Sequence, residues 1–149
     1  MAKLTDIKNK FNTSRISVGG IPQYIFDNLS EINSDKQQDY PALLLKPPVS
    51  NYAAKDKSVK DWQIDFFLFD LWLPNGETEL RTLEQVWEAL EDKGMAIIAD
   101  ILSDRPTYGM VNMDTEPKIT LGYPFHNDRL VGVRFQFTLR AWYACKDNV

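Results

Sequence analysis

The sequence predicts a single α+β domain over residues 1–149, with an antiparallel β-sheet packed against one long amphipathic helix and a short N-terminal helix. Three segments carry this prediction. Residues 61–73 are apolar on both faces of a predicted strand. Residues 80–102 repeat apolar side chains at helical spacing, and residues 130–145 alternate apolar and polar as in a half-buried strand. Strands grouped on either side of one helix are typical of α+β proteins.

The N-terminal region predicts a short helix and an interrupted strand. Leu4, Ile7 and Phe11 are spaced for one helix face, and the polar residues 12–14 predict the end of that helix. Residues 16–26 favour a strand with a bulge or bend, because glycine and proline within them weaken regular pairing.

A buried strand is predicted at 40–46, since this short apolar run is closed by Pro47 and Pro48. Loops are expected on both sides of it. Residues 28–39 are polar, and residues 49–60 predict a long polar loop. A loop of that length in a compact domain is usually functional or mobile.

The strand at 61–73 is expected to need cover on both faces. One face carries Trp62, Ile64, Phe66, Leu68 and Trp72, and the other carries Phe67, Phe69, Leu71 and Leu73.

The helix predicted after this strand has several expected details. Asn75 or Thr78 is the expected N-cap, Glu77 and Arg81 are spaced for an i,i+4 ion pair, and Gly94 is expected to kink or split the helix. Pro106 ends the helical pattern.

The C-terminal third predicts short strands at 108–113 and 118–121, a loop at 122–129 and a long last strand. In that strand the odd-numbered positions from 131 to 143 are apolar. The even-numbered positions from 134 to 142 form a more polar face.

Composition excludes several classes of protein. The net charge of −4 and a pI near 5.0 lack the basic excess of a nucleic-acid reader. The single cysteine, Cys145, cannot form an internal disulfide or a cysteine-rich zinc site. No signal-peptide or membrane-spanning segment is apparent, so we expect a soluble protein that is not exported.

No catalytic constellation is apparent, and no catalytic, cofactor-binding or metal-binding residue is predicted. His126, the only histidine, lies in a turn-like stretch and is interpreted as a surface residue. Metal ligands are poorly represented, because Glu84, Glu88, Glu91 and Asp92 look like the solvated face of the helix. Paired carboxylates are possible in any fold, but Asp65 and Asp70 fall on opposite faces of their strand.

Two groups of residues are candidates for partner contact. Tyr52, Lys55, Lys57 and Lys60 lie in the predicted loop, where solvation or protein contact is favoured over nucleic-acid contact. Trp142 falls on the polar face of the last strand with Arg134 and Arg140. An aromatic residue beside arginines indicates either a protein interface or a tryptophan under the N-terminal helix, and both readings remain open.

Three segments together resemble tail terminator and related neck proteins of tailed bacteriophages. They are the Tyr-Pro strand at 39–48 that opens into a polar loop, the strand 61–73 that runs into the long helix, and the Tyr123-Pro-Phe segment before the last strand. The resemblance spans most of residues 39–145 and rests on the order and spacing of these segments.

The resemblance implies a non-enzymatic virion protein without cofactors, assembled in the host cytoplasm. Such proteins form rings, usually homohexamers, that cap the tail tube and join it to the neck or capsid. The implied partners are further copies of the chain, the tail tube protein and neck or connector proteins, with no membrane. DNA would pass through the lumen without specific binding, so we expect a neutral or acidic inner wall. Residues 49–60 are the implied partner-contacting loop.

Other functions remain open at this point. A head–tail adaptor or another neck protein would share these features. In a different class, a small carboxylate-based enzyme or ligand-binding domain would need a concave pocket that holds acidic residues.

Overall fold

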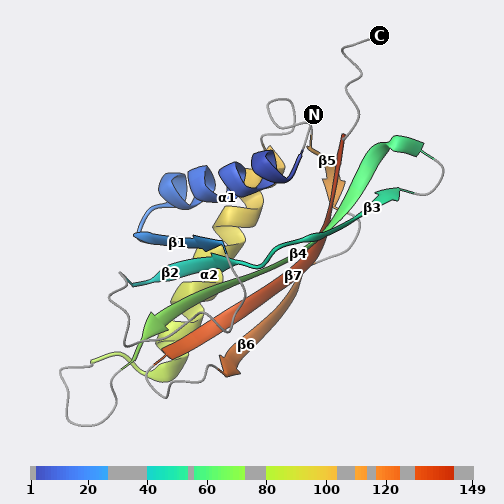
Figure 1. The fold of residues 1–149 in the computed structure, drawn as a ribbon. Helices are drawn as coiled ribbons and strands as arrows, with labels where there is room; N and C mark the ends of the chain where they lie inside the picture. The colour runs from blue at the N-terminus through green and yellow to red at the C-terminus, as the bar shows by residue number, and fades with distance from the viewer. Residues whose placement is uncertain are drawn as a thin grey trace.

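A computed structural model of the chain describes residues 3–26, 40–53, 56–72, 80–103, 110–113, 117–124 and 130–142. It confirms the α+β class (Figure 1). The elements in chain order are α1 (Leu4–Val18), β1 (Gln23–Phe26), β2 (Ala42–Leu45), β3 (Val49–Ala53), β4 (Asp56–Leu71), α2 (Leu83–Ser103), β5 (Met110–Met113), β6 (Lys118–Pro124) and β7 (Leu130–Trp142).

The sheet is built around one long antiparallel ladder. Residues Val59–Leu71 of β4 pair with Leu130–Trp142 of β7 along their whole length. The strands β2 and β3 follow one another along the outer side of β4, and β6 and β5 do the same along β7. The first strand, β1, pairs with β2.

The predicted antiparallel sheet contains one parallel pair, formed by β1 and β2. A parallel pair needs a long connection, and residues 27–41 separate these two strands. The loop predicted at 28–39 lies outside the described residues. The sheet is therefore mixed, with antiparallel pairing everywhere else.

The helix α1 continues past the polar residues that were expected to end it. Ser14 donates a hydrogen bond to the Asp100 carboxylate of α2, and Thr13 donates to the carbonyl oxygen of Lys10. These bonds satisfy the hydroxyls without interrupting the helix. The helix stops at Gly19, whose φ is +80°, so the strand expected from residue 16 begins only at Gln23.

The long loop expected at 49–60 is instead a β-hairpin. The strand β3 pairs with the first part of β4, with Val49 opposite Gln63 and Tyr52 opposite Lys60. A register shift follows at Ala53, which pairs with Asp56. Figure 1 shows this hairpin extending away from the helices. The polar sequence of this segment did not predict the hairpin, because its pairing depends on the adjacent β4 strand rather than on a local apolar alternation.

The helix α2 begins at Leu83 with a reciprocal cap. The backbone N–H of Thr82 donates to the Gln85 side-chain oxygen, and the backbone N–H of Gln85 donates to Thr82 Oγ1. The expected caps, Asn75 and Thr78, lie outside the described residues. Leu80 precedes the helix and is 96% exposed, so it does not join the core as the apolar pattern predicted.

Two further expectations about α2 also change. Gly94 does not split the helix, which is continuous to Ser103. Arg81 binds the Asp70 carboxylate at 3.0 Å and donates to the carbonyl oxygen of Leu71, while its expected partner Glu77 lies outside the described residues.

The C-terminal strands follow the prediction with shifted ends. The strand β6 runs to Pro124, so the loop expected at 122–129 starts later, and residues 125–129 lie outside the described part. Gly122 has a φ of +67°, and a Cβ there would approach the Trp87 ring to 2.8 Å. Glycine therefore suits both the backbone and the close packing of α2 on β6.

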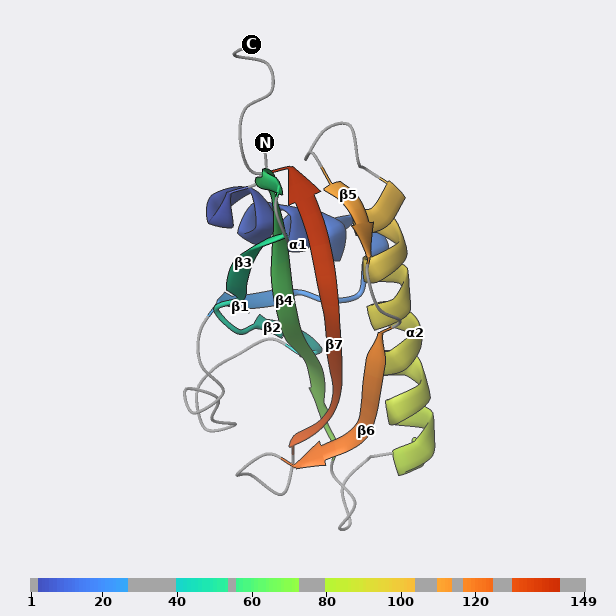
Figure 2. The ribbon, with the colours of Figure 1, turned by 90° about the vertical axis from the view of Figure 1, so that its right-hand side faces the viewer.

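Both helices lie on one face of the sheet (Figure 2). The main core lies between the helices and the sheet. From the sheet it takes the predicted even-numbered face of β4 and the odd-numbered face of β7. Phe66 stacks on Phe135 with ring centroids 4.7 Å apart, and Phe11 of α1 meets Phe66 edge-on. A smaller cluster on the other face contains Ala42, Leu44, Phe67, Phe69 and Leu130. The two-faced apolar pattern predicted for β4 is confirmed.

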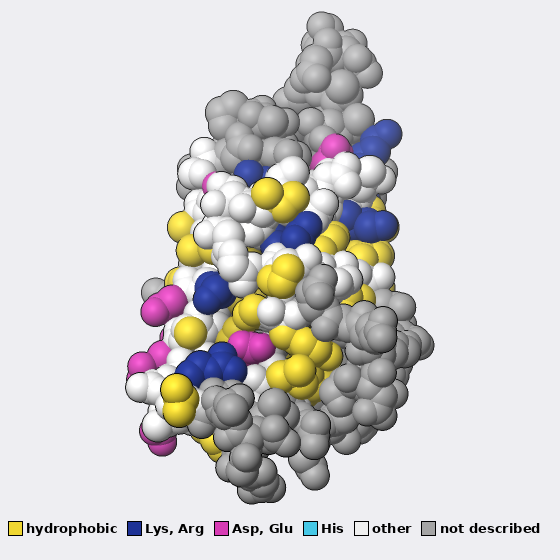
Figure 3. Space-filling view, turned by 90° about the vertical axis from the view of Figure 1, so that its left-hand side faces the viewer, with side chains coloured by type: hydrophobic (Ala, Val, Ile, Leu, Met, Phe, Trp, Pro, Cys, Tyr) yellow, Lys and Arg dark blue, Asp and Glu magenta, His cyan; other side chains and the backbone are white. Residues whose placement is uncertain are grey.

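The side of the molecule opposite to Figure 2 has scattered apolar, cationic and acidic side chains, with several of the acidic ones along one margin (Figure 3). Among the described residues, no helix is long and apolar enough to span a membrane.

Candidate partner-binding surface

The half of the sheet near the β3–β4 hairpin has a polar face that no described helix covers (Figure 2). We define this polar face by Lys46, Asp61, Gln63, Asp65, Lys118, Arg134, Gln136, Thr138 and Arg140. The residues come from β4, β6, β7 and the turn between β2 and β3 because strand alternation turns these positions to the same side.

Two arginine–carboxylate pairs cross the central ladder on this face. Arg134 donates from Nε and Nη2 to the two oxygens of Asp65 at 3.0 and 2.6 Å. Arg140 donates in the same way to Asp61 at 2.8 and 3.1 Å. All four side chains are partly exposed. Two parallel hydrogen bonds per pair fix each arginine in one orientation, and each pair contributes on the order of 1 kcal/mol.

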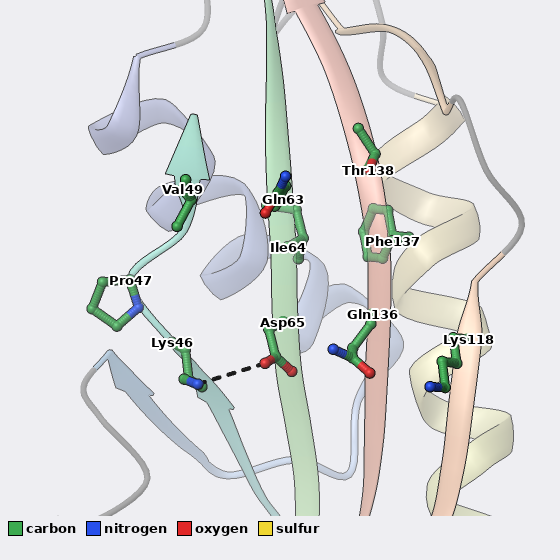
Figure 4. Close-up of a pocket in the computed structure, with 10 residues that line it drawn as sticks. All are labelled: Lys46, Pro47, Val49, Gln63, Ile64, Asp65, Lys118, Gln136, Phe137 and Thr138. Atoms are coloured by element: carbon green, nitrogen blue, oxygen red, sulfur yellow. Dashed lines mark ion pairs between the residues drawn. The ribbon is translucent and has the colours of Figure 1, made fainter. Parts of the chain in front are cut away.

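The Asp65 carboxylate also binds Lys46 at 3.7 Å (Figure 4). The Arg134 guanidinium in turn lies 5.5 Å from the centre of the Phe67 ring, which belongs to the smaller apolar cluster. Asp65 therefore binds one cation from β7 and one from the turn between β2 and β3.

A hollow of about 370 Å³ lies in the middle of the polar face. On one side of the ladder, β2 ends opposite Phe66 and β3 starts opposite Gln63, with Pro47 and Pro48 between them. On the other side, β6 starts opposite Gln136 and β5 ends opposite Leu139. The strands that flank the β4–β7 ladder are therefore interrupted at the same level on both sides.

Figure 4 shows what this double interruption exposes. Gln63, Asp65, Gln136 and Thr138 lie on the floor of the hollow, and Lys46 and Lys118 stand at its two sides. The lining mixes polar and apolar side chains and has a lysine at each rim.

The structure does not bring the predicted contact residues into one surface. Arg134 and Arg140 lie on the polar face, whereas Lys60 lies on the opposite side of β4, 5.3 Å from the centre of the Trp62 ring. The indole nitrogen of Trp62 is buried and has no hydrogen-bond partner within the described residues.

The remaining candidates are placed only by their backbones. Tyr52 lies in β3 opposite Lys60, Lys57 lies in β4, and Trp142 lies in β7 opposite Val59. Lys55 is outside the described residues. The interface role predicted for these residues therefore stays a prediction.

Sequence reasoning missed the acidic partners of the two arginines. Asp61 and Asp65 are four residues apart on the same face of β4. In the ladder with β7, Asp61 lies opposite Arg140 and Asp65 lies opposite Gln136. Only the register between β4 and β7 identifies these pairs, although the shared polar alternation of the two strands was visible in the sequence. No feature of the sequence indicated that Lys46 and Lys118 belong to this face.

The clearest pKa shifts belong to tyrosines away from the polar face. Burial raises the pKa of the Tyr24 hydroxyl well above its usual value, and the nearby Arg15 charge offsets part of this shift. Burial and the negative charge of Asp70 both raise the pKa of Tyr40. Both hydroxyls are therefore held neutral.

Within the described ranges, no group of three histidine, cysteine, aspartate or glutamate side chains is arranged to hold a metal ion. His126 and Cys145 lie outside those ranges.

A comparison with models of known protein families gives no match to this chain, and a comparison with curated protein sequences gives none either.

Proposed function

We propose that the protein is a structural subunit of a tailed bacteriophage, a tail terminator that forms a ring between the tail tube and the neck. The proposal starts from the resemblance in the sequence. The observation that carries it furthest is the β3–β4 hairpin, which extends away from the helices at the segment where the resemblance implies partner contact (Figure 1).

The hairpin has the form of a contact element. Its outer strand, β3, pairs with β4 on one side, and no described strand pairs with its other side. Val49 in this strand is 59% exposed. A free strand edge and exposed apolar side chains are features through which neighbouring chains pair.

The polar face supports an assembly role over carboxylate-based catalysis. Asp61 and Asp65 are each bound by an arginine through two hydrogen bonds. Both oxygens of each carboxylate are occupied by an arginine, which suits a structural ion pair better than a general acid.

The proposal is tested in two steps. Light scattering at several concentrations measures the solution mass, and we expect a ring of several copies, six in the resembling family. Electron microscopy of the particle then locates the chain. Density for this protein anywhere other than between tube and capsid would refute the terminator assignment. A position on the capsid side of the neck would favour a head–tail adaptor.

A further inference from the structure

The polar face carries more positive than negative charge. Four cationic side chains, Lys46, Lys118, Arg134 and Arg140, share it with the two carboxylates of Asp61 and Asp65. Lys118 is exposed and has no ion pair within the described part of the chain. This balance contrasts with the net charge of −4 of the whole protein.

The helix α2 carries the opposite charge on its exposed side. Glu84, Glu88 and Asp92 follow one another at four-residue spacing and are exposed, and Glu91 lies beside them. We call these four residues the acidic stripe. None of them has an ion-pair or hydrogen-bond partner among the described residues.

The acidic stripe places like charges next to one another along the helix. Like charges at i,i+4 destabilise a helix by about 0.2–0.5 kcal/mol per pair, and Glu84–Glu88 and Glu88–Asp92 are both such pairs. No lysine or arginine lies three or four residues away within α2 to offset them. A cationic partner surface would relieve this repulsion.

We infer that the polar face of one copy of this chain binds the acidic stripe of α2 of a second copy. The inference rests on the proposed ring and names the contact that would build it. Because the two surfaces differ, each copy uses one of them toward each neighbour, and such head-to-tail contacts generate closed rings when the rotation between copies closes.

The dimensions of the two surfaces agree. Lys46 and Lys118 flank the two central strands, so three inter-strand spacings separate them, or about 14 Å. Eight residues of helix separate Glu84 from Asp92, or about 12 Å. A helix laid across the strands at the hollow would therefore bring carboxylates near both lysines.

The charges of the polar face favour a helix over DNA as its occupant. Asp61 and Asp65 lie between the cations and would repel a continuous phosphate backbone. The helix carries only a few discrete carboxylates. Glu84 and Asp92 can approach the lysines at the two rims, while Glu88 between them would face Gln136 and the Asp65 carboxylate that Arg134 already binds.

Two charge-reversal variants of the full chain test the contact. The face variant is Lys46→Glu with Lys118→Glu, and the helix variant is Glu84→Lys with Glu88→Lys and Asp92→Lys. Lys3→Glu at the N-cap of α1 with Lys8→Glu within α1 is the control, because it changes the net charge as the face variant does. Thermal unfolding checks that each variant is folded.

Sedimentation equilibrium at low and moderate salt measures self-association. We expect the wild type and the control to associate, more weakly at higher salt, and each charge-reversal variant to associate at least tenfold more weakly. An equimolar mixture of the two variants should recover the wild-type mass, because both kinds of contact are then complementary again.

Three outcomes would overturn this inference. They are a wild type that stays monomeric at low salt, variants that associate as the wild type does, and a mixture without recovery. Variants that still form the ring would leave the proposed function standing and refute only this contact. Duplex DNA that binds the wild type but not the face variant would assign the polar face to nucleic acid instead.

Discussion

Gly94 of α2 lies directly against the ring of Phe135 in β7. A Cβ at Gly94 would lie 2.0 Å from Phe135 Cζ, and the ring has no room to retreat because Phe66 stacks on its other side. This contact brings the long helix close to the sheet at the centre of the core.

Gly94→Ala is therefore expected to destabilise the fold by about 2–3 kcal/mol through overpacking. Helix propensity alone predicts the opposite sign, a gain of about 1 kcal/mol. Urea unfolding of both proteins measures the difference. Ala96→Gly, at an exposed position of the same helix, is the control and should cost about 1 kcal/mol. A Gly94→Ala variant as stable as the wild type would contradict the close contact.

A second prediction concerns the junction between α1 and α2. The Lys10 side chain is 6% exposed, and its ammonium lies 3.3 Å from the Asp100 carboxylate, which also accepts a hydrogen bond of 2.6 Å from Ser14. Asp100→Asn should destabilise the fold by about 1–3 kcal/mol, because it leaves a buried cation without this counter-ion.

A double-mutant cycle with Lys10→Met isolates the interaction. The double variant should be more stable than the sum of the two single changes predicts, because it removes both charges together. Additive effects in denaturant unfolding would show that the ion pair contributes nothing measurable.

The third prediction concerns stability at alkaline pH. Tyr24 donates a hydrogen bond of 2.9 Å to the carbonyl oxygen of Lys8, and burial raises the pKa of Tyr24 above the ordinary 10.0. Its contribution to stability is complete below pH 10 and is lost as the pH rises further, because the unfolded chain ionises this hydroxyl while the folded chain holds it neutral.

The comparison variant is Tyr24→Phe. It should be about 1 kcal/mol less stable near neutral pH through loss of the hydrogen bond. Above pH 10 its unfolding free energy should fall less steeply than that of the wild type. Parallel pH profiles would mean that Tyr24 titrates normally in the folded protein.

The fourth prediction tests the start of α2. Thr82→Ala removes the side-chain acceptor for the N–H of Gln85 and should cost about 1 kcal/mol. Thr82→Ser keeps that acceptor and should cost only a few tenths. Thermal unfolding of the two variants separates the contribution of the cap from other effects of the position. Equal losses of stability in both variants would show that the Thr82 hydroxyl does not cap the helix.

The elements with strong apolar periodicity were predictable, and those that depend on a neighbouring strand were not. The faces of β4 and β7 follow from the alternation of single residues such as Phe66 and Phe67. The β3–β4 hairpin was missed because Tyr52 and Lys60 pair through their backbones, and polar side chains leave no apolar pattern to reveal such pairing.

Long-range contacts explain the other differences. Ser14 was interpreted as a helix stop, but its hydroxyl finds an acceptor in Asp100, which lies 86 residues further along the chain. Arg134 and Arg140 were expected on an outward polar face, and they lie there. Their pairing with Asp65 and Asp61 required the register of the ladder.

The interruption of the flanking strands on both sides of the ladder, at the level of Pro47, also has a mechanical consequence. At this level the described sheet narrows to β4 and β7, whereas it is at least four strands wide above and below. Among the described strands, only β4 and β7 run past this level, so within the sheet they alone transmit a load between the hairpin end and the opposite end.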